Sequence, residues 1–338
     1  MLKPDMRKPA ADTVSPVERL HALLAADMTA TDKMIHARMG SAVVLIPNLA
    51  HHLIDSGGKR LRPMLTLAAA RMGGYRGDKH VNLAAAVEFI HTATLLHDDV
   101  VDASTLRRGK VAANLVWGNK ATVLVGDFLF SRAFELMVDT GQLEVLGILA
   151  HASSIIAEGE VMQLKSANNL AATEEHYLCV VRAKTAALFS AAAQAGARLA
   201  RRSSDYEAAL ECYGDNLGIA FQLVDDALDY SGRQALMGKS IGDDFREGKV
   251  TLPVILAAAR ADETARRFWI RTIETGPQSE SDLDQAITLV EETGAISDTM
   301  SRARAYADKA CDALDAVAPC ETRDVLAAIA DFCVERAY

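Results

Sequence analysis

Helix-forming residues dominate this 338-residue chain, and only eight prolines interrupt them. Apolar side chains recur at three- and four-residue spacing, as they do along one face of an α-helix, and no alternation of strand and helix patterns appears. The periodicity therefore predicts an all-α fold. The expected helices, with boundaries uncertain by about two to four residues, cover residues 16–32, 38–55, 61–72, 80–102, 112–138, 143–166, 173–199, 204–231, 251–260, 263–275, 280–294, 296–316 and 321–336.

Candidate linkers are short. Breaks fall at residues 55–63, 73–80, 166–173, 232–249 and 274–281. None is long or polar enough to separate two domains, and a hydrophobic content of 50% suffices for a sizeable core. We predict a single all-α domain spanning residues 1–338, with residues 1–15 as a flexible N-terminal segment.

Net charge and cysteine usage restrict the possible environments and partners. A net charge of −9 argues against a general nucleic-acid binder, because phosphate backbones are held by excess Lys and Arg. No segment resembles a signal peptide or offers about 20 uninterrupted apolar residues for a membrane span. We therefore predict a cytoplasmic protein. Its cysteines, which form no CxxC pair and are expected to be core residues, are Cys179, Cys212, Cys311, Cys320 and Cys333.

An aspartate motif occurs twice in apolar helical surroundings, as DDVVD at 98–102 and as DDALD at 225–229. In the first copy, His91, Leu95, Asp98 and Asp102 follow one helix face. Residues four apart on a helix lie about 5–6 Å apart at Cβ, close enough for Asp98 and Asp102 to hold one cation. A buried carboxylate needs such a partner.

The second copy makes a similar stripe, consisting of Gln222, Asp225, Asp226 and Asp229. Carboxylates of this kind suit Mg²⁺, which commonly binds substrate phosphate as well, and neither copy has the spaced loop of an EF-hand. Solvated acidic helix faces are the alternative interpretation. The apolar neighbours and the presence of two copies favour the metal site.

Basic residues accompany both motifs. Lys59, Arg60 and Arg62 follow a Gly57–Gly58 turn near an expected helix start, where an anion can bind. The other basic or polar candidates are Arg107, Arg108, Lys184, Thr185, Lys239 and Lys249. Surface salt bridges could explain any one of them, but together with the aspartates they predict a cavity for diphosphate.

In the order of its motifs the chain resembles trans-polyprenyl diphosphate synthases, and most closely the long-chain synthases. The matching segments are GGKRLRP, FIHTATLLHDDVVD, RRGK, GDFLFSRAF, AEGEVMQL, KTAALF, FQLVDDALDY and GKSIGDDFREGKVTLP. The resemblance runs from about Leu20 to the C-terminus. It implies an isoprenoid-synthase type of helical bundle around a deep central cavity, a homodimer, and condensation of isopentenyl diphosphate with an allylic diphosphate such as farnesyl or geranyl diphosphate.

The resemblance also implies roles for individual residues. The isopentenyl diphosphate positions are Lys59, Arg62, His91 and Arg108, with Arg60 as a neighbour. The allylic diphosphate positions are Arg107, Lys184, Thr185, Gln222, Lys239 and Lys249. Asp98 and Asp102 match the ligands of two Mg²⁺ ions. Asp225, together with Asp226 and Asp229, matches the ligands of a third. The residues expected to carry catalysis are Asp98, Asp102, Arg107, Lys184 and Asp225.

Product length depends on the helical turn before Asp98. The positions there are Ala93 and Thr94, both small, whereas relatives that stop at farnesyl or geranylgeranyl carry an aromatic ring at one of them. We expect a product of about eight to ten isoprene units (C40–C50), for example for a quinone side chain. A shorter-chain synthase, a class I terpene cyclase and a noncatalytic subunit of a heteromeric synthase are the alternatives, and the two intact aspartate motifs disfavour the last two.

Overall fold

The computed structural model describes residues 14–231 and 241–335, so most of the predicted flexible segment 1–15, and Lys239, lie outside the described residues. The prediction of an all-α fold is confirmed. The elements are α1 Pro16–Leu23, α2 Ala25–Arg38, α3 Leu45–Ile54, α4 Leu61–Met72, α5 Lys79–Val101, β1 Leu106–Arg107, β2 Lys110–Val111, α6 Ala113–Trp117, α7 Asn119–Val138, α8 Leu143–Ser166, α9 Glu174–Val181, η1 Arg182–Ala186, α10 Ala187–Leu199, α11 Ser204–Asp229, α12 Asp243–Arg246, α13 Leu252–Ala259, α14 Glu263–Trp269, η3 Ile270–Thr275, α15 Glu280–Glu292, α16 Ala295–Ala313, η4 Leu314–Ala316 and α17 Glu321–Glu335.

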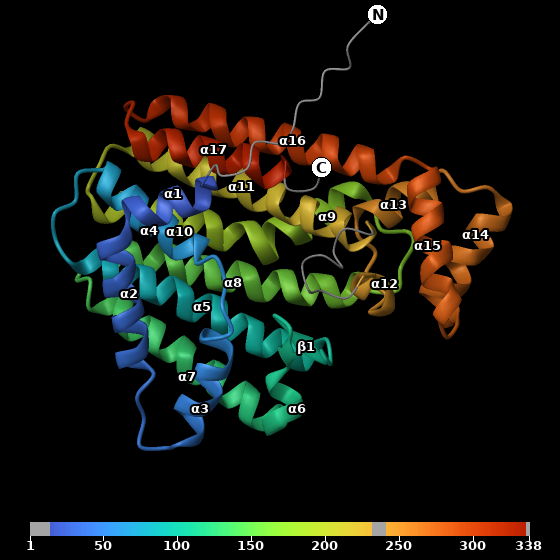
Figure 1. Cartoon of the computed structure of the whole chain (residues 1–338), viewed down its shortest axis with the longest axis horizontal. Helices are drawn as coiled ribbons and strands as arrows, with labels where there is room; N and C mark the ends of the chain where they lie inside the picture. Colours follow the sequence, from blue (N-terminus) through green and yellow to red (C-terminus); the bar gives the residue numbers. More distant parts are fainter. Residues whose placement is uncertain (1–13, 232–240, 336–338) are drawn as a thin grey trace, which may run out of the picture.

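The long helices pack side by side into a bundle (Figure 1). α11 contacts α10 on one side and α16 on the other, while α5 packs against α7 and α4. Two clusters of buried apolar residues result, one centred on α11 with α16 and α17, the other on α5 and α7 with parts of α8 and α10. Both aspartate motifs therefore stand at the C-terminal ends of helices that are embedded in the core.

Several predicted helices are shortened or interrupted. The helix expected over 38–55 begins only at Leu45, because the Ser41 hydroxyl accepts the Val43 N–H (3.1 Å) and offers the backbone a turn instead of a helix. The helix expected over 112–138 breaks at Gly118, where φ is 81°. The remaining residues form α6 and α7.

A π-helical turn, η1, interrupts the helix predicted over 173–199 and carries Lys184. It packs between α8 and α11 because glycines on both helices leave room for it. A Cβ at Gly159 would lie 2.8 Å from Ala183 Cβ, and a Cβ at Gly218 would lie 2.6 Å from Ala186 Cα. π-Turns inside helices are frequent at functional sites. Here the turn brings Lys184 between the two aspartate helices.

A short antiparallel hairpin, absent from the prediction, follows the first aspartate motif. Leu106 pairs with Val111 and Arg107 with Lys110, leaving Arg108 and Gly109 as the two turn residues. Both have positive φ, 51° and 75°, as a type I′ turn requires. The hairpin fixes two adjacent arginines beside the C-terminal end of α5.

The cysteines and helix α8 are less buried than a core position requires. Of the five cysteines only Cys333 is buried, whereas Cys179, Cys212 and Cys320 are exposed, so the expectation of five core cysteines is wrong. Cys179 and Cys212 occupy exposed positions of α9 and α11, and Cys320 lies in the loop just before α17. Among the described residues, one helix is long and apolar enough to cross a membrane by length and composition, namely α8, and a third of its apolar window (33%) is buried in the bundle.

Candidate active site

A cavity of about 310 Å³ lies between the C-terminal ends of α5 and α11, the hairpin and the segment from α12 to Lys249. The structure brings ten predicted site residues to its wall, namely Asp98, Asp102, Arg107, Arg108, Lys184, Gln222, Asp225, Asp226, Asp229 and Lys249. An adjoining cavity of about 330 Å³ shares Lys184, Gln222 and Lys249 and adds Thr185. The two aspartate motifs, 127 positions apart in sequence, thus face one space.

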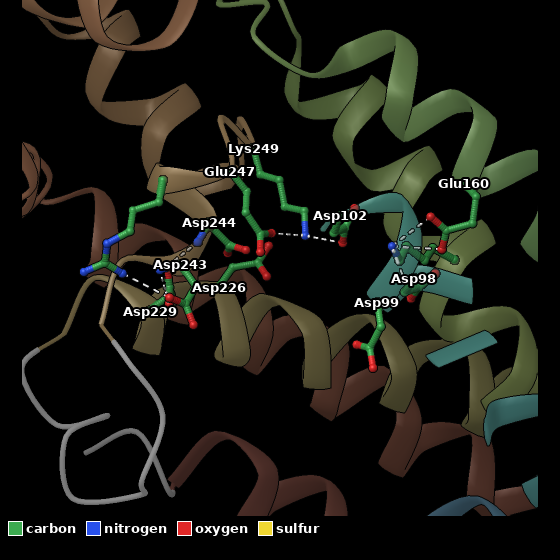
Figure 2. A network of polar contacts seen from close by, with 12 residues as sticks. Asp98, Asp99, Asp102, Glu160, Asp226, Asp229, Asp243, Asp244, Glu247 and Lys249 are labelled. Atoms are coloured by element: carbon green, nitrogen blue, oxygen red, sulfur yellow. Dashed lines mark hydrogen bonds and ion pairs between the residues drawn. The ribbon is translucent and has the colours of Figure 1, made fainter. Parts of the chain in front are cut away.

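In the first motif, Asp98 faces Lys184 across the cavity (Oδ2 to Nζ, 3.6 Å), and Lys184 also contacts Glu160 of α8 at 2.8 Å (Figure 2). Burial raises the pKa of Glu160 to about 7, Asp98 adds to the shift, and Lys184 opposes it. A single lysine is therefore shared by two carboxylates. It stands where a substrate anion could displace it from either one.

Asp102, one turn further along, binds Lys249 (Oδ2 to Nζ, 2.9 Å). Lys249 also contacts Glu247 at 2.5 Å. Burial alone would lower the pKa of Lys249, but Asp244, Asp102 and Glu247 outweigh it and raise that pKa. Lys249 therefore carries its charge at any physiological pH.

Asp99, the middle acid of the first motif, points away from Asp98 and Asp102 (Figure 2). It is fully buried, accepts a hydrogen bond from Arg107 Nε (2.7 Å) and forms an ion pair with the same guanidinium, whose Nη2 lies 2.7 Å from Asp99 Oδ1. Its backbone carbonyl accepts the amide of Asn114 on α6 (2.9 Å). Burial raises the pKa of Asp99, and Arg107 opposes the shift. Arg107 thus lines the cavity while being fixed from behind by Asp99.

The second motif is embedded more deeply. Asp226 is 3% exposed and accepts hydrogen bonds from the Tyr177 hydroxyl (2.5 Å) and the Gln222 amide (2.6 Å). Gln222 in turn accepts the Thr185 hydroxyl (2.9 Å). Burial raises the pKa of Asp226 to about 7 against these hydrogen bonds, with Asp225 adding to the rise. Thr185 and Gln222 thus position this acid.

Asp229 closes the second motif and caps the short helix α12. It accepts the backbone N–H groups of Asp243 (3.3 Å) and Asp244 (3.0 Å). Burial nevertheless raises the pKa of Asp229 to about 6. Burial also raises the pKa of Asp244 well above its usual range, and Asp226 and Asp229 add to that rise. Four carboxyl side chains thus crowd this wall, those of Asp226, Asp229, Asp243 and Asp244.

The donor set fits divalent cations. Eight carboxyl side chains but only four basic ones belong to the described residues that line the 310 Å³ cavity. An excess of buried acids is unfavourable unless positive charge compensates it. The oxygens of Asp98, Asp102 and Asp225 are hard ligands of the kind that Mg²⁺ prefers.

A second group of cations lies beside the first motif, joined to the cavity by Arg108. Arg108 donates to the Gly57 carbonyl, and Arg62 Nη1 lies 3.3 Å from His91 Nε2. Arg62 also stacks over the Phe189 ring (4.2 Å), and Lys59 Nζ lies 5.9 Å from the Phe332 ring.

His91 and Arg62 share a strongly positive environment. Burial and then Arg62 and Arg108 lower the pKa of His91 well below its usual value. Burial lowers the pKa of Arg62 to about 10. Because the Arg62 guanidinium can only donate, a neutral His91 accepts this hydrogen bond at Nε2 without adding charge. The stripe drawn from His91 to Asp98 in the sequence is therefore divided in the structure, with His91 facing the arginines and Asp98 facing Lys184.

Arg60 has a different task from its neighbours. It pairs with buried Glu88 of α5 and donates to the Ile54 carbonyl (3.1 Å). Its own φ is 49°, a left-handed conformation that is uncommon for a residue with a side chain. Arg60 therefore ties the Gly57–Gly58 turn to α5.

The two positions predicted to set product length, Ala93 and Thr94, lie one turn before Asp98, toward the core. Ala93 is fully buried in the cluster that also contains Leu129, Ala133 and Ala191. The half-buried Thr94 donates its hydroxyl to the His91 carbonyl (2.8 Å). Small side chains thus follow the helix inward from the aspartates.

Sequence reasoning missed several residues of the site, namely Glu88, Asp99, Glu160, Tyr177, Asp243, Asp244 and Glu247. Some carried a signal. Asp243 and Asp244 form a third pair of adjacent aspartates shortly before Lys249, and Glu160 lies in AEGEVMQL, one of the matching segments. Tyr177 carried none, because only the packing of α9 on α11 brings it to Asp226.

Fold and site together define an all-α enzyme with an acidic metal-type cavity beside a cluster of phosphate-type cations. The comparisons with known proteins agree. Residues 43–290 match the family model described as polyprenyl synthetase. Over 320 residues the chain is 43% identical to octaprenyl diphosphate synthase of Escherichia coli, covering 95% of this chain and 99% of that protein.

Solved structures are similar as well. A polyprenyl synthase from Caulobacter crescentus, complexed with calcium and isoprenyl diphosphate, superposes with a TM-score of 0.93 at 52% identity, covering 97% of this chain and 100% of that one. A decaprenyl diphosphate synthase from Rhodobacter capsulatus gives 0.92 at 55% identity, with coverages of 96% and 100%. The chain belongs to the polyprenyl synthetase family and is a prenyltransferase.

Proposed function

We propose that the protein is a long-chain trans-polyprenyl diphosphate synthase, which adds isopentenyl diphosphate units head to tail to an allylic diphosphate. The observation that carries this proposal is the meeting of both aspartate motifs on one cavity, beside a separate group of cations. Two anionic sites are what a condensation of two diphosphates needs. The octaprenyl and decaprenyl synthases among the relatives support the long-chain assignment.

The two diphosphates occupy different walls. The isopentenyl diphosphate is held by Lys59, Arg62, His91 and Arg108. The allylic diphosphate is held at the cavity wall by Arg107, Lys184, Thr185, Gln222 and Lys249, and Lys239 belongs to the same group by resemblance. Arg107 and Lys184 already have fixed partners, Asp99 and Glu160, so these cations are preorganised before substrate arrives.

Condensation begins with heterolysis of the allylic C–O bond, which leaves an allylic cation and places more negative charge on the departing diphosphate. Lys184 and Lys249 stabilise that charge in the transition state. The alkene of isopentenyl diphosphate then attacks C1, forming a C–C bond, and loss of a proton to the departed diphosphate gives a trans product five carbons longer. The apolar bundle keeps water from quenching the cation.

Asp98, Asp102 and Asp225, with Asp226 and Asp229, fit the ligand set for Mg²⁺, and we propose three ions per site. When bound, Mg²⁺ supplies positive charge to the diphosphate oxygens. The calcium in the related Caulobacter structure is consistent with a divalent-cation site in this family.

Product length is set on the core side of Asp98. A chain whose diphosphate is held at the aspartates must pass Ala93 and Thr94, which lie roughly 6–7.5 Å along the axis at 1.5 Å per residue. These small side chains allow a product of about C40–C50. The substitution Ala93→Phe should shorten products to about three or four units while sparing the first condensation, and an unchanged long product from a folded, active variant would place the path elsewhere.

A homodimer would explain an exposed apolar surface on α7 and α8. Leu124, Leu143, Val161 and Leu164 are 57–80% exposed. The same surface explains why α8 has membrane-like composition without needing a membrane, and we propose a cytoplasmic enzyme that releases a lipophilic product. Static light scattering at micromolar concentration should give about twice the monomer mass.

The deciding experiment is incubation with isopentenyl diphosphate, farnesyl diphosphate and Mg²⁺. We expect pyrophosphate release and, after dephosphorylation, a mass series ending at about eight to ten units. A terminal product of three or four units would instead identify a shorter-chain synthase. No pyrophosphate release from the folded protein with either farnesyl or geranyl diphosphate would identify a noncatalytic subunit.

A further inference from the structure

Two histidines and an aspartate converge where α3 lies next to the C-terminal part of α2, outside the catalytic cavity (Figure 1). His36 belongs to α2, His51 to α3, and Asp55 is the residue that ends α3. One ring nitrogen of each histidine and one carboxylate oxygen lie within 4.8 Å of one another. Nothing in the proposed prenyl transfer uses these three residues.

The tautomer of His36 is fixed by a backbone hydrogen bond. Its Nδ1 lies 2.8 Å from the Asp32 carbonyl oxygen, which can only accept, so Nδ1 carries the proton. In the neutral ring, Nε2 then presents a lone pair toward the Asp55 carboxylate, 3.4 Å away. Two acceptors face each other in that state, an unfavourable arrangement that either a proton on Nε2 or a metal cation between them relieves. A second ring nitrogen bonded to a backbone carbonyl is also the usual arrangement for a metal-binding histidine.

The spacing is close to that of a tetrahedral site. Ligand atoms about 2.0–2.1 Å from zinc are roughly 3.3 Å apart. His36 Nε2 lies 3.4 Å from Oδ1 of Asp55, and His51 Nδ1 lies 3.0 Å from Oδ2 of the same carboxylate. The side chains are 40–48% exposed, so small rotations can close the remaining gap between the two rings while leaving a fourth position to water.

The neighbouring histidine is excluded from the group. His52 directs its Nε2 to the Val111 carbonyl (2.8 Å) and packs its ring against Trp117 at 5.0 Å. His52 is half-buried, as His51 is, but its partners are different. His52 therefore provides a matched control for any effect of His51.

We propose that His36, His51 and Asp55 bind one divalent transition-metal ion of the zinc type. Two imidazoles and one carboxylate are a donor set that zinc takes with a water in the fourth position. The ion holds α3 against α2 across the turn that replaces the predicted helix at 39–44. Asp55 lies two residues before Gly57, whose carbonyl accepts a hydrogen bond from Arg108. A metal ion bound to Asp55 would therefore also stabilise the turn that leads to the second group of cations.

The test is titration of the purified full-length protein with Zn²⁺ by calorimetry, in millimolar Mg²⁺ to occupy the aspartate cavity. We expect one equivalent that is lost, or weakened more than tenfold, in His36→Ala, His51→Ala and Asp55→Ala, because even outer partners of metal ligands change affinity by about that factor. His52→Ala should retain it. Zn²⁺ should raise the melting temperature of wild type and His52→Ala but not of the other three.

The alternatives give different results. Binding that is equal in wild type and in the double variant His36→Ala/His51→Ala would overturn the proposal and locate Zn²⁺ at the exposed cysteines or the aspartates. Equal weakening by His52→Ala would also overturn it, since that ring has no place in the group. Circular dichroism of each metal-free variant establishes that the loss is one of binding and not of folding.

Discussion

The two aspartate motifs have nearly the same sequence but opposite surroundings. In the first, Asp98 and Asp102 face lysines at 3.6 and 2.9 Å. In the second, Asp226 and Asp229 accept hydrogen bonds from neutral groups, and burial raises the pKa of both. One motif is balanced by charge and the other is left with excess acid.

The middle acids of the two motifs differ in the same way. Asp99 and Asp226 occupy equivalent positions and are both buried. Asp99 is neutralised by Arg107, whereas Asp226 receives a tyrosine hydroxyl and a glutamine amide. Helical spacing decides which acids share a face, but the packed neighbours decide their charge. The second motif should therefore depend on added cations more than the first.

The largest effect should come from removing the leading acid of either motif. Asp98→Asn and Asp225→Asn should each reduce turnover about a thousand-fold, or roughly 4 kcal/mol in the barrier, because both acids are proposed to hold metal against leaving-group charge. The melting temperatures should change little. Pyrophosphate release at saturating Mg²⁺ measures the effect, with the surface variant Asp139→Asn as control. Near-normal turnover of both variants would remove the metal assignment.

A smaller effect should separate the two cation groups. Arg108→Ala should chiefly weaken the binding of isopentenyl diphosphate, and Lys184→Ala should chiefly weaken the binding of the allylic substrate. Each loss should be about 1.5–3 kcal/mol, the range for hydrogen bonds to charged groups. Titration of each variant with each substrate gives four affinities. Equal losses for both substrates in both variants would show that the walls are not divided as proposed.

The middle acids should differ in stability. Asp99→Asn breaks a largely buried ion pair and should lower the free energy of unfolding by about 2 kcal/mol, below the range for fully buried pairs because Arg107 is 29% exposed. Asp226→Asn keeps an oxygen for the Tyr177 hydroxyl and should lower it by about 1 kcal/mol or less. Chemical denaturation of the metal-free proteins gives both values. The reverse order would mean that Asp226 is the ionised and charge-paired acid.

The sequence predicted the residues that carry the chemistry of the site better than the residues that hold them in place. Periodicity placed Asp98 and Asp102 on one face, and the motif order placed the arginines near them, because both depend on local spacing. Glu160 and Tyr177 contact the site only through packing of α8 and α9. The hairpin at Leu106–Val111 followed from a two-residue turn with positive φ, which the letters RRGK do not demand. The spacing of residues along the sequence does not determine long-range packing or turn geometry.

The smallest and most specific effect concerns pH. Asp226 and Asp229 have folded-state pKa values raised to about 7 and about 6, while an unfolded aspartate titrates near 3.9. Between about pH 4 and pH 7 the native state thus binds more protons than the unfolded state, so stability decreases as pH rises through this window. The metal-free protein should melt a few degrees lower at pH 7.5 than at pH 5.5, by about 2–4 °C per kcal/mol. Mg²⁺ binds the ionised acids and should restore more stability at pH 7.5 than at pH 5.5. In Asp226→Asn one of the two titrations is removed, and the decrease with pH should be shallower. Parallel melting profiles for wild type and Asp226→Asn would show that the second motif is ionised throughout this pH range.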